Sequence, residues 1–286
     1  MPHDVQALTL PTHFYGGPPK AGSSWIHSLL EAHPDVFVPD GKYVQFFTDF
    51  YGRGLEWYAG LYMAARPEIR VRCDLTTDYL FEPEAAERLA RDIPHACIFF
   101  SLRNPVERDW SAYQHLLRTG QVTGPIEQEI DRAHRLLSRC STYSEAIERS
   151  WRLFGRERTC ILWFDDIRAD PQKAADSLHD FLGVSRRAIS REDEGAKNPA
   201  RAARNPRLNG LLKKSVVAMR AAGLSRLIAR AKDNPMLDRV LFSADRVPRL
   251  RDCPREWSFL ADRHAAEIDR LEALLGCNLD AWRTRP

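Results

Sequence analysis

Residues 14–34 read FYGGPPKAGSSWIHSLLEAHP, and this stretch decides the fold. A short apolar run enters a turn of two glycines and two prolines, and an apolar pattern at helical spacing begins at Ser24. A strand, a glycine-rich turn and a helix in this order are typical of a phosphate-binding loop, because backbone N–H groups and the positive helix end face the anion. The stretch therefore predicts an α/β fold with an anion site at its first turn.

The lysine of this loop stands in an unusual position. Gly17 and Gly22 have the glycine spacing of a Walker A loop, G-x-x-x-x-G-K-[ST]. Ser23 occupies the place of the Walker lysine, and Lys20 comes two residues before Gly22 instead. This argues against the usual site for a magnesium-bound nucleoside triphosphate. The alternative interpretation is a tight strand-to-helix turn with an N-cap serine and a solvated lysine.

Further apolar runs continue the α/β pattern along the chain. Nearly continuous apolar character is expected of parallel strands that are covered on both faces. Such runs occur at residues 12–16, 96–102 and 159–164, with a weaker one at 69–73. Helical patterns occur between or after them, at residues 24–32, 83–91, 105–118, 142–154 and 171–182. The alternation predicts a central parallel sheet flanked by helices.

The composition changes after Gly183. Residues 186–206 are charged and interrupted by Asn and Pro, which predicts a loop or lid. Helical stretches follow at residues 207–231 and 255–275, so the C-terminal part is expected to be mainly helical. We expect one domain over residues 1–286, with an α/β core at 12–185, the loop at 186–206 and the helical part at 207–286.

Composition limits the function classes. The 286 residues carry a formal net charge of only +3, which disfavours general nucleic-acid binding. No apolar run approaches the roughly 18 residues of a membrane span, and the first 14 residues lack the pattern of a signal peptide. The six cysteines form no C-x-x-C pair, which favours reduced thiols and gives metal ligation no support. We expect a cytoplasmic protein without a metal.

A second polar stretch, RNPVERDWSAY, follows the strand expected at residues 96–102. Arg103 emerges at the carboxyl end of that strand, where open α/β sheets bind ligands. Asn104 can cap the next helix, and Pro105 suits its first position. Arg103 and Ser111 can converge on one anion, the first through its guanidinium fork and the second through its hydroxyl. The alternative is an exposed arginine and a well-capped helix.

Together the two stretches resemble one family. PKAGSSW (19–25) resembles the 5′-phosphosulfate loop, K-x-G-[ST]-[ST], of sulfotransferases that use 3′-phosphoadenosine 5′-phosphosulfate (PAPS). RNPVERDWSAY (103–113) resembles their 3′-phosphate motif, and residues 38–62 resemble the carbohydrate-sulfotransferase branch and its bacterial relatives. The resemblance covers residues 12–185 and, loosely, the last thirty.

The resemblance implies a fold, a reaction and a set of residues. The fold is P-loop-like, with three layers around the parallel sheet. The reaction moves a sulfuryl group from PAPS to a hydroxyl of an oligosaccharide or small-molecule natural product, without a metal, and leaves adenosine 3′,5′-bisphosphate. Lys20 would neutralise charge on the bridging oxygen, and Arg103 and Ser111 would hold the 3′-phosphate. The 5′-phosphate would be held by Ala21, Gly22, Ser23, Ser24 and Trp25.

The chain departs from this family at the general base. The carbohydrate branch has a Lys-Glu pair before its FF segment, and the glutamate is the base; Tyr43 stands there in this chain. We rank Asp74, at the end of the weak strand, first. Tyr43, with a reference pKa near 10, is second, and His115 is third. The alternative for Asp74 is a strand-end cap or an ion pair with Arg70 or Arg72.

Other interpretations stay open. A P-loop kinase would bind ATP with magnesium, and a non-catalytic relative would bind PAPS or the bisphosphate without turnover. The Arg-rich residues 197–209 are either a lid on the 3′-phosphate or a solvated linker. The aromatic residues between positions 46 and 62 either line an acceptor cleft or pack between helices.

Overall fold

The computed structural model describes residues 9–40, 43–132, 136–137, 139–189, 201–203, 242–246 and 248–285. The chain divides into two compact units. The first consists of Met1–Arg103 and Thr142–Ala196, and the second of Asn104–Ser141 and Lys197–Pro286. The helix predicted at residues 207–231 and most of the predicted loop at 186–206 lie outside the described residues.

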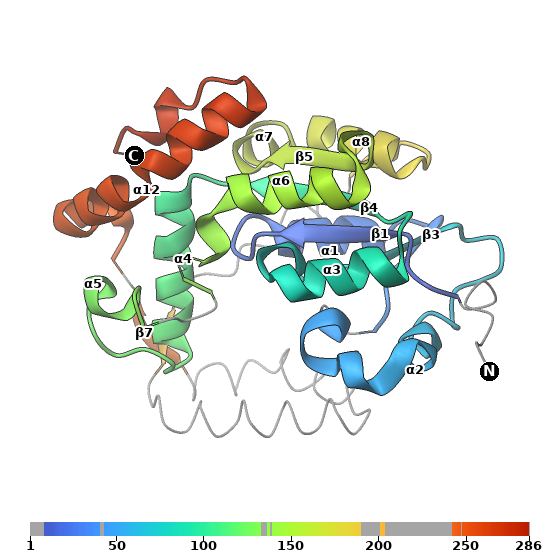
Figure 1. The fold of residues 1–286 in the computed structure, drawn as a ribbon. Helices are drawn as coiled ribbons and strands as arrows, with labels where there is room; N and C mark the ends of the chain where they lie inside the picture. Colours follow the sequence, from blue (N-terminus) through green and yellow to red (C-terminus); the bar gives the residue numbers. More distant parts are fainter. Residues whose placement is uncertain are drawn as a thin grey trace. The chain divides into compact units, whose positions relative to one another are not determined.

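A five-stranded parallel sheet forms the centre of the first unit (Figure 1). Its order is β2-β3-β1-β4-β5. The strands are β1 (His13–Gly17), β2 (Val36–Phe37), β3 (Val71–Asp74), β4 (Cys97–Leu102) and β5 (Thr159–Trp163). The four predicted strands are confirmed, with ends that differ by one or two residues. The sequence did not predict β2, because two residues are too short to show a period.

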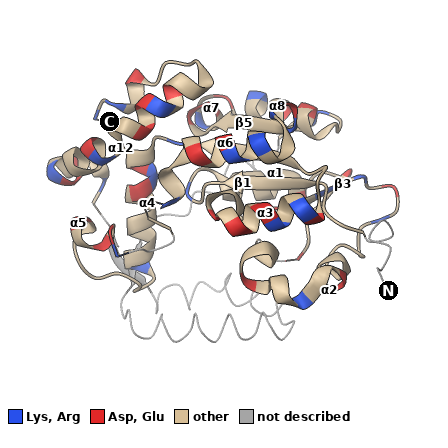
Figure 2. Ribbon diagram, viewed as in Figure 1, with Lys and Arg blue, Asp and Glu red and all other residues tan. Residues whose placement is uncertain are grey.

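The strands are apolar because helices cover both faces of the sheet. All five residues of β1 and five of the six in β4 are buried. Figure 2 shows the strands β1 and β5 without charged residues, whereas Lys, Arg, Asp and Glu lie on the helices around them. This distribution is the one expected for a parallel sheet inside an α/β fold.

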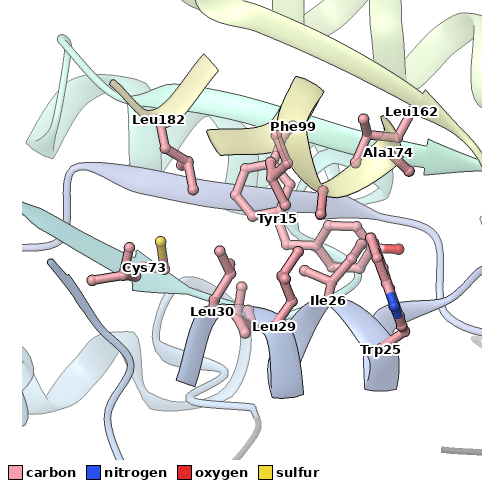
Figure 3. Close-up of a cluster of buried hydrophobic side chains, with 14 of the residues drawn as sticks. Tyr15, Trp25, Ile26, Leu29, Leu30, Cys73, Phe99, Leu162, Ala174 and Leu182 are labelled. Atoms are coloured by element: carbon pink, nitrogen blue, oxygen red, sulfur yellow. The ribbon is translucent and has the colours of Figure 1, made fainter. Parts of the chain in front are cut away.

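The first unit therefore has three layers, as predicted. Helices α1 (Ser23–Glu31), α7 (Phe164–Ala169) and α8 (Pro171–Leu182) pack their apolar side chains on one face (Figure 3). Tyr15, Phe99 and Leu162 supply the sheet side of this core. Helices α3 (Pro83–Asp92) and α6 (Tyr143–Phe154) cover the other face (Figure 1). Between β2 and β3 lie a π-helical turn (Phe46–Phe50), a 3₁₀ turn (Tyr51–Arg53) and α2 (Gly54–Gly60).

The second unit contains two long described helices, α4 (Pro105–Arg118) and α12 (Pro254–Leu275), and the short α5 (Ile126–Glu129). Asn104 caps α4 as predicted, since its side-chain oxygen accepts a hydrogen bond from the Val106 amide at 3.0 Å. An antiparallel pair, β6 (Arg201–Ala203) and β7 (Phe242–Arg246), is also present. The expectation of a loop at residues 201–203 is therefore wrong. A three-residue strand shows no recognisable period, and its partner β7 lies about forty residues away in sequence.

A buried ionic cluster joins α4 to α12 within the second unit. Arg108 and Asp109 are fully buried and form an ion pair. Asp109 also contacts His264 Nε2 at 2.7 Å and accepts a hydrogen bond from Ser141 at 3.0 Å. Arg108 and His264 lower the pKa of Asp109 to about 2, although burial acts in the opposite direction. The cluster keeps the two helices together by charge as well as by apolar packing.

The described helices include none that could cross a membrane; even the 22-residue α12 lacks a sufficiently apolar stretch.

Candidate active site

The topology of the sheet indicates where a ligand would bind. β1 and β4 are neighbours in the sheet, and the strands that follow each of them in sequence lie on opposite sides, β2 and β3 beyond β1 and β5 beyond β4. In open α/β sheets such a point opens a crevice at the carboxyl ends of the strands. The lysine loop, which we define as residues 17–22, follows β1 at this edge, and Arg103 follows β4.

Glycines allow the lysine loop its shape. Gly17 has a φ of +91°, and a Cβ atom there would overlap the Thr77 carbonyl oxygen. Gly22 has a φ of +98° and is the N-cap of α1. Lys20 also lies in the left-handed region, with a φ of +73°. A non-glycine residue in this region is strained, and such strain persists where the surrounding structure enforces it.

The N-cap of α1 is Gly22, which has no side chain to cap the first amides of the helix. The N-cap serine considered from the sequence is therefore wrong, because α1 starts at Ser23 and its cap is Gly22. Amides at a helix start point outward and carry partial positive charge, so this end of α1 is suited to an anion. Ser23, Ser24 and Trp25 form the first turn of the helix, as the phosphate-binding interpretation requires.

Two buried hydroxyl groups contact the carbonyl oxygens of the lysine loop. The Tyr15 hydroxyl lies 3.0 Å from the Pro18 oxygen, and Ser101 Oγ lies 2.5 Å from the Ala21 oxygen. The two hydroxyl oxygens are 2.5 Å apart. Neither residue is part of a recognisable motif. The available signal was a serine inside the apolar strand CIFFSL, because a buried hydroxyl needs a hydrogen-bond partner.

Arg103 follows β4 at its carboxyl end, where the sequence placed it, and lies beside the lysine loop. Its Nη1 donates a hydrogen bond to the Lys20 carbonyl oxygen at 3.2 Å. Its guanidinium also lies 4.7 Å from the centre of the Phe164 ring. The Tyr143 hydroxyl donates to the Arg103 carbonyl oxygen at 2.9 Å, which fixes the backbone at this point. Arg103 is thus held beside the loop by its side chain and by its backbone.

Tyr43 also lies against the helix start. Its hydroxyl oxygen is 3.4 Å from Ser23 Oγ, and the residue is half-buried. The segment that carries Tyr43 therefore reaches the first turn of α1, although Tyr43 and Ser23 are twenty residues apart in sequence.

Asp74 ends β3 as expected, but its carboxylate does not face a cleft. It is fully buried and accepts hydrogen bonds from the Tyr58 hydroxyl (2.7 Å), the Tyr79 hydroxyl (3.1 Å) and both the amide and hydroxyl of Thr76 (2.9 and 2.7 Å). Burial raises the pKa of Asp74, and these hydrogen bonds oppose the rise. Arg72 donates to backbone carbonyls instead. The geometry corresponds to the strand-end cap and does not support Asp74 as the base.

The hydrogen bonds of Asp74 continue to the segment after Tyr43. Thr76 Oγ1 accepts from the amides of Val44 and Gln45 at 3.1 and 3.0 Å. The Tyr79 oxygen accepts from the Phe46 amide at 2.7 Å. We call Asp74, Thr76 and Tyr79 the Asp74 network. It fixes the backbone of residues 44–46. Thr76 and Tyr79 were not predictable from the sequence, because their partners lie some thirty residues away along the chain.

Ser111 and His115 belong to the second unit. Both lie on α4 and are half-buried, and His115 Nδ1 is 3.1 Å from Arg118 Nη2. Arg108, three residues before Ser111, is fully buried in its pair with Asp109. That Ser111 acts with Arg103 and that His115 serves as a base stay predictions.

The aromatic residues between positions 46 and 62 divide into two groups. Phe46, Phe47, Tyr58 and Tyr62 are fully buried, and the Phe46 and Tyr58 rings stack at 4.2 Å. Packing accounts for these four. The others, Phe50, Tyr51 and Trp57, are half-buried.

Known proteins that resemble this chain are sulfotransferases. Residues 13–196 match the sulfotransferase domain family. Bifunctional heparan sulfate N-deacetylase/N-sulfotransferase 4 of Mus musculus is 28% identical over 209 residues, 62% of this chain and 22% of that protein. The human N-deacetylase/N-sulfotransferase 3 is 30% identical over 202 residues, 61% of this chain and 22% of that protein. The chain thus spans about a fifth of the length of these curated relatives.

A solved structure gives the same fold. The crystal structure of a sulfotransferase from Alicyclobacillus acidocaldarius superposes with a TM-score of 0.67 at 24% identity, over 96% of this chain and 99% of that chain. Its likeness extends the fold comparison well beyond residues 13–196.

Proposed function

The chain belongs to the sulfotransferase domain family, and we propose on this basis that it transfers a sulfuryl group from PAPS to an acceptor hydroxyl and releases adenosine 3′,5′-bisphosphate. The observation that carries the proposal is the meeting of Arg103 with the lysine loop at the start of α1. Lys20, Arg103 and the amides at the helix start form a cationic site at the sheet edge where α/β proteins bind ligands.

The residues of this site divide the work between the two phosphates of the nucleotide. The amides of residues 21–25 and the hydroxyls of Ser23 and Ser24 hold the 5′-phosphate at the positive end of α1. By its resemblance to the 3′-phosphate motif, RNPVERDWSAY assigns Arg103 and Ser111 to the 3′-phosphate. This assignment follows the motifs PKAGSSW and RNPVERDWSAY, and the contact between Arg103 and Lys20 supports it.

The chemistry requires charge stabilisation and removal of one proton. The acceptor oxygen forms a bond to sulfur while the bond from sulfur to the bridging oxygen breaks, and the electron pair remains on the 5′-phosphate. Lys20 neutralises this developing charge, which is the main catalytic contribution expected for such loose, in-line transfers. The acceptor proton passes to a base. The position of Tyr43 against Ser23 supports Tyr43 in this role, with His115 as the alternative.

The acceptor is proposed at the level of a chemical class. The curated relatives are named for heparan sulfate N-sulfotransferases, which supports a carbohydrate acceptor. Their names also make an amine nitrogen an alternative to a hydroxyl oxygen. A small-molecule natural product remains part of the proposed range.

Isothermal titration calorimetry with two ligands tests the proposal. We expect the bisphosphate to bind and ATP with magnesium to bind much more weakly, because Lys20 precedes Gly22. Tighter binding of ATP with magnesium would indicate a kinase. Turnover of PAPS with a pooled panel of sugars and phenols is the second measurement. Bisphosphate binding without turnover on any acceptor would indicate a non-catalytic relative, which the Tyr43 substitution for glutamate specifically favours.

A further inference from the structure

The buried hydroxyl groups of Tyr15 and Ser101 have no part in the proposed function so far. Both side chains are 0% exposed, and they come from the adjacent strands β1 and β4. Their three contacts, to each other and to the carbonyl oxygens of Pro18 and Ala21, tie these strands to the lysine loop on both sides of Lys20.

The number of protons limits how this group is bonded. Two hydroxyl groups supply two protons for three contacts. If Tyr15 donated to Pro18 and Ser101 donated to Ala21, the two hydroxyl oxygens would face each other at 2.5 Å with no proton between them. One hydroxyl must therefore donate to the other, so only one of the two loop carbonyl oxygens accepts a hydrogen bond from this pair.

The distances indicate which carbonyl keeps its donor. Ser101 Oγ lies 2.5 Å from the Ala21 oxygen, whereas the Tyr15 oxygen lies 3.0 Å from the Pro18 oxygen. Two oxygen atoms 2.5 Å apart repel each other unless a proton lies between them, so the contact of Ser101 with Ala21 must be a hydrogen bond. Burial raises the pKa of Tyr15, so the phenol retains its proton and can donate it. The hydrogen bonds thus run from Tyr15 to Ser101 and from Ser101 to the Ala21 carbonyl.

The Ala21 carbonyl belongs to the peptide group whose N–H is that of Gly22, the N-cap of α1. A hydrogen bond to a carbonyl oxygen polarises the peptide group, so its N–H becomes a stronger donor. The Pro18 carbonyl could not act in this way, because the next residue is Pro19, which has no N–H. Tyr15 and Ser101 therefore act on the Ala21–Gly22 peptide group, which has an N–H that can bind an anion.

We propose that Tyr15 and Ser101 are positioning residues for the 5′-phosphate, which hold the Ala21–Gly22 peptide group in place and strengthen the Gly22 N–H as a donor to the anion. This rests on the proposed function, since it takes the 5′-phosphate of the nucleotide as the anion. The two residues need not touch the ligand. They act through the peptide group between them and the helix start.

The test compares two nucleotides that differ only at the 5′ position. Affinities for adenosine 3′,5′-bisphosphate and adenosine 3′-monophosphate are measured by calorimetry, the weaker ligand by displacement. Ser101→Ala is expected to weaken bisphosphate binding about tenfold, as for one lost hydrogen bond, and to leave monophosphate binding unchanged. A merely structural defect would lower both affinities alike.

Ser150→Ala is the matched control. Ser150, on α6, is also a fully buried serine in a hydroxyl pair, with Thr159 Oγ1 at 2.9 Å, at the amino end of β5. Because the strands are parallel, this pair lies at the opposite edge of the sheet from the lysine loop. We expect Ser150→Ala to lower the melting temperature without changing either affinity.

Two further variants complete the test. Ser101→Thr keeps the hydroxyl and is expected to recover most of the lost bisphosphate affinity. Tyr15→Phe leaves the bond to Ala21 intact and is expected to cost about threefold, which also keeps the proposal testable if Ser101→Ala does not fold. Equal losses for both nucleotides, or no loss beyond that of Ser150→Ala, would overturn the proposal. A wild-type protein that does not bind the bisphosphate would overturn the proposed function, and the inference with it.

Discussion

Lys20 occupies a strained backbone conformation between two prolines and Gly22, with its carbonyl oxygen bonded to Arg103. The bond to Arg103 and the conformation of the loop fix the backbone from which the Lys20 side chain leaves. We take the strain as a sign of function, since an unstrained glycine would be available at such a position.

Replacement of Lys20 by alanine should lower the rate of sulfuryl transfer much more than the affinity for the bisphosphate. We expect Lys20→Ala to reduce PAPS turnover about a hundred- to a thousandfold, as for the loss of one charge-stabilising group, while bisphosphate affinity falls little. The exposed Lys173, on α8, provides the control, and Lys173→Ala should be unchanged in both measurements. Wild-type turnover in Lys20→Ala would remove Lys20 from the mechanism.

Arg103 should contribute mainly to affinity. Arg103→Ala is expected to weaken bisphosphate binding about ten- to a hundredfold, because a charge-assisted contact to the 3′-phosphate is lost. Calorimetry measures the loss. Arg158→Ala is a suitable control, because Arg158 also donates to a backbone carbonyl, that of Pro94, at the amino end of β5. If both variants bind equally well, Arg103 does not hold the nucleotide.

At the scale of elements, the segment after Tyr43 depends on the Asp74 network. Val44, Gln45 and Phe46 have their amides bonded to Thr76 and Tyr79, and the hydroxyl protons of those two residues are directed to Asp74. Gln45 has a φ of +57°, so this backbone needs external support. Through Thr76 and Tyr79, Asp74 thus supports the backbone that leads into the π-helical turn.

Asp74→Asn should therefore impair transfer without the signature of a lost base. The side-chain N–H₂ group of an asparagine would face a hydroxyl or amide donor and break part of the Asp74 network. We expect this to lower the free energy of unfolding by about 1–3 kcal/mol and turnover about tenfold. The pH profile of turnover should keep its shape, because Asp74 does not titrate against the acceptor. Asp92→Asn, which removes a carboxylate bonded to Tyr51 at 2.7 Å, is the control. A profile that loses its limb on the acid side would restore Asp74 as the base.

The sequence predicted the elements better than it predicted this network. Strands such as CIFFSL are recognisable because both faces of a parallel strand are buried, and Asn104 and Pro105 mark the start of α4 by local chemistry alone. The position of Asp74 at a strand end was also correct. Its burial was not predictable, because it results from Tyr58 and Tyr79, whose approach depends on the tertiary packing of Phe46 and Phe47.

At the scale of the whole molecule, the chain combines two compact units with different means of stabilisation. The first has an extended apolar core on its sheet, and the second adds the buried ionic cluster of Arg108, Asp109 and His264. Buried charges of this kind are sensitive to the loss of one partner, because the remaining charge stays without compensation.

Acid should weaken the second unit through Asp109. The pKa of Asp109 is lowered from 3.8 to about 2 in the folded state, so the unfolded chain takes up the proton more readily. Its contribution, about 2 kcal/mol, is present above pH 4 and is lost as the pH falls from about 4 to about 2. Urea unfolding between pH 2 and pH 6 measures this loss. Asp109→Asn should unfold more easily at pH 6 and lose this part of the pH dependence; an unchanged dependence would exclude Asp109 as its source.

Gly17 brings the lysine loop into direct contact with the turn after β3. Its backbone lies so close to the Thr77 carbonyl that no side chain fits between them, and Thr77 is the neighbour of Thr76 in the Asp74 network. The lysine loop, which we assign to the donor, therefore lies in direct contact with the turn after β3 that holds the backbone of residues 44–46. A displacement of the lysine loop toward Thr77 would therefore also press on the Asp74 network, because the two segments are packed directly against each other at Gly17.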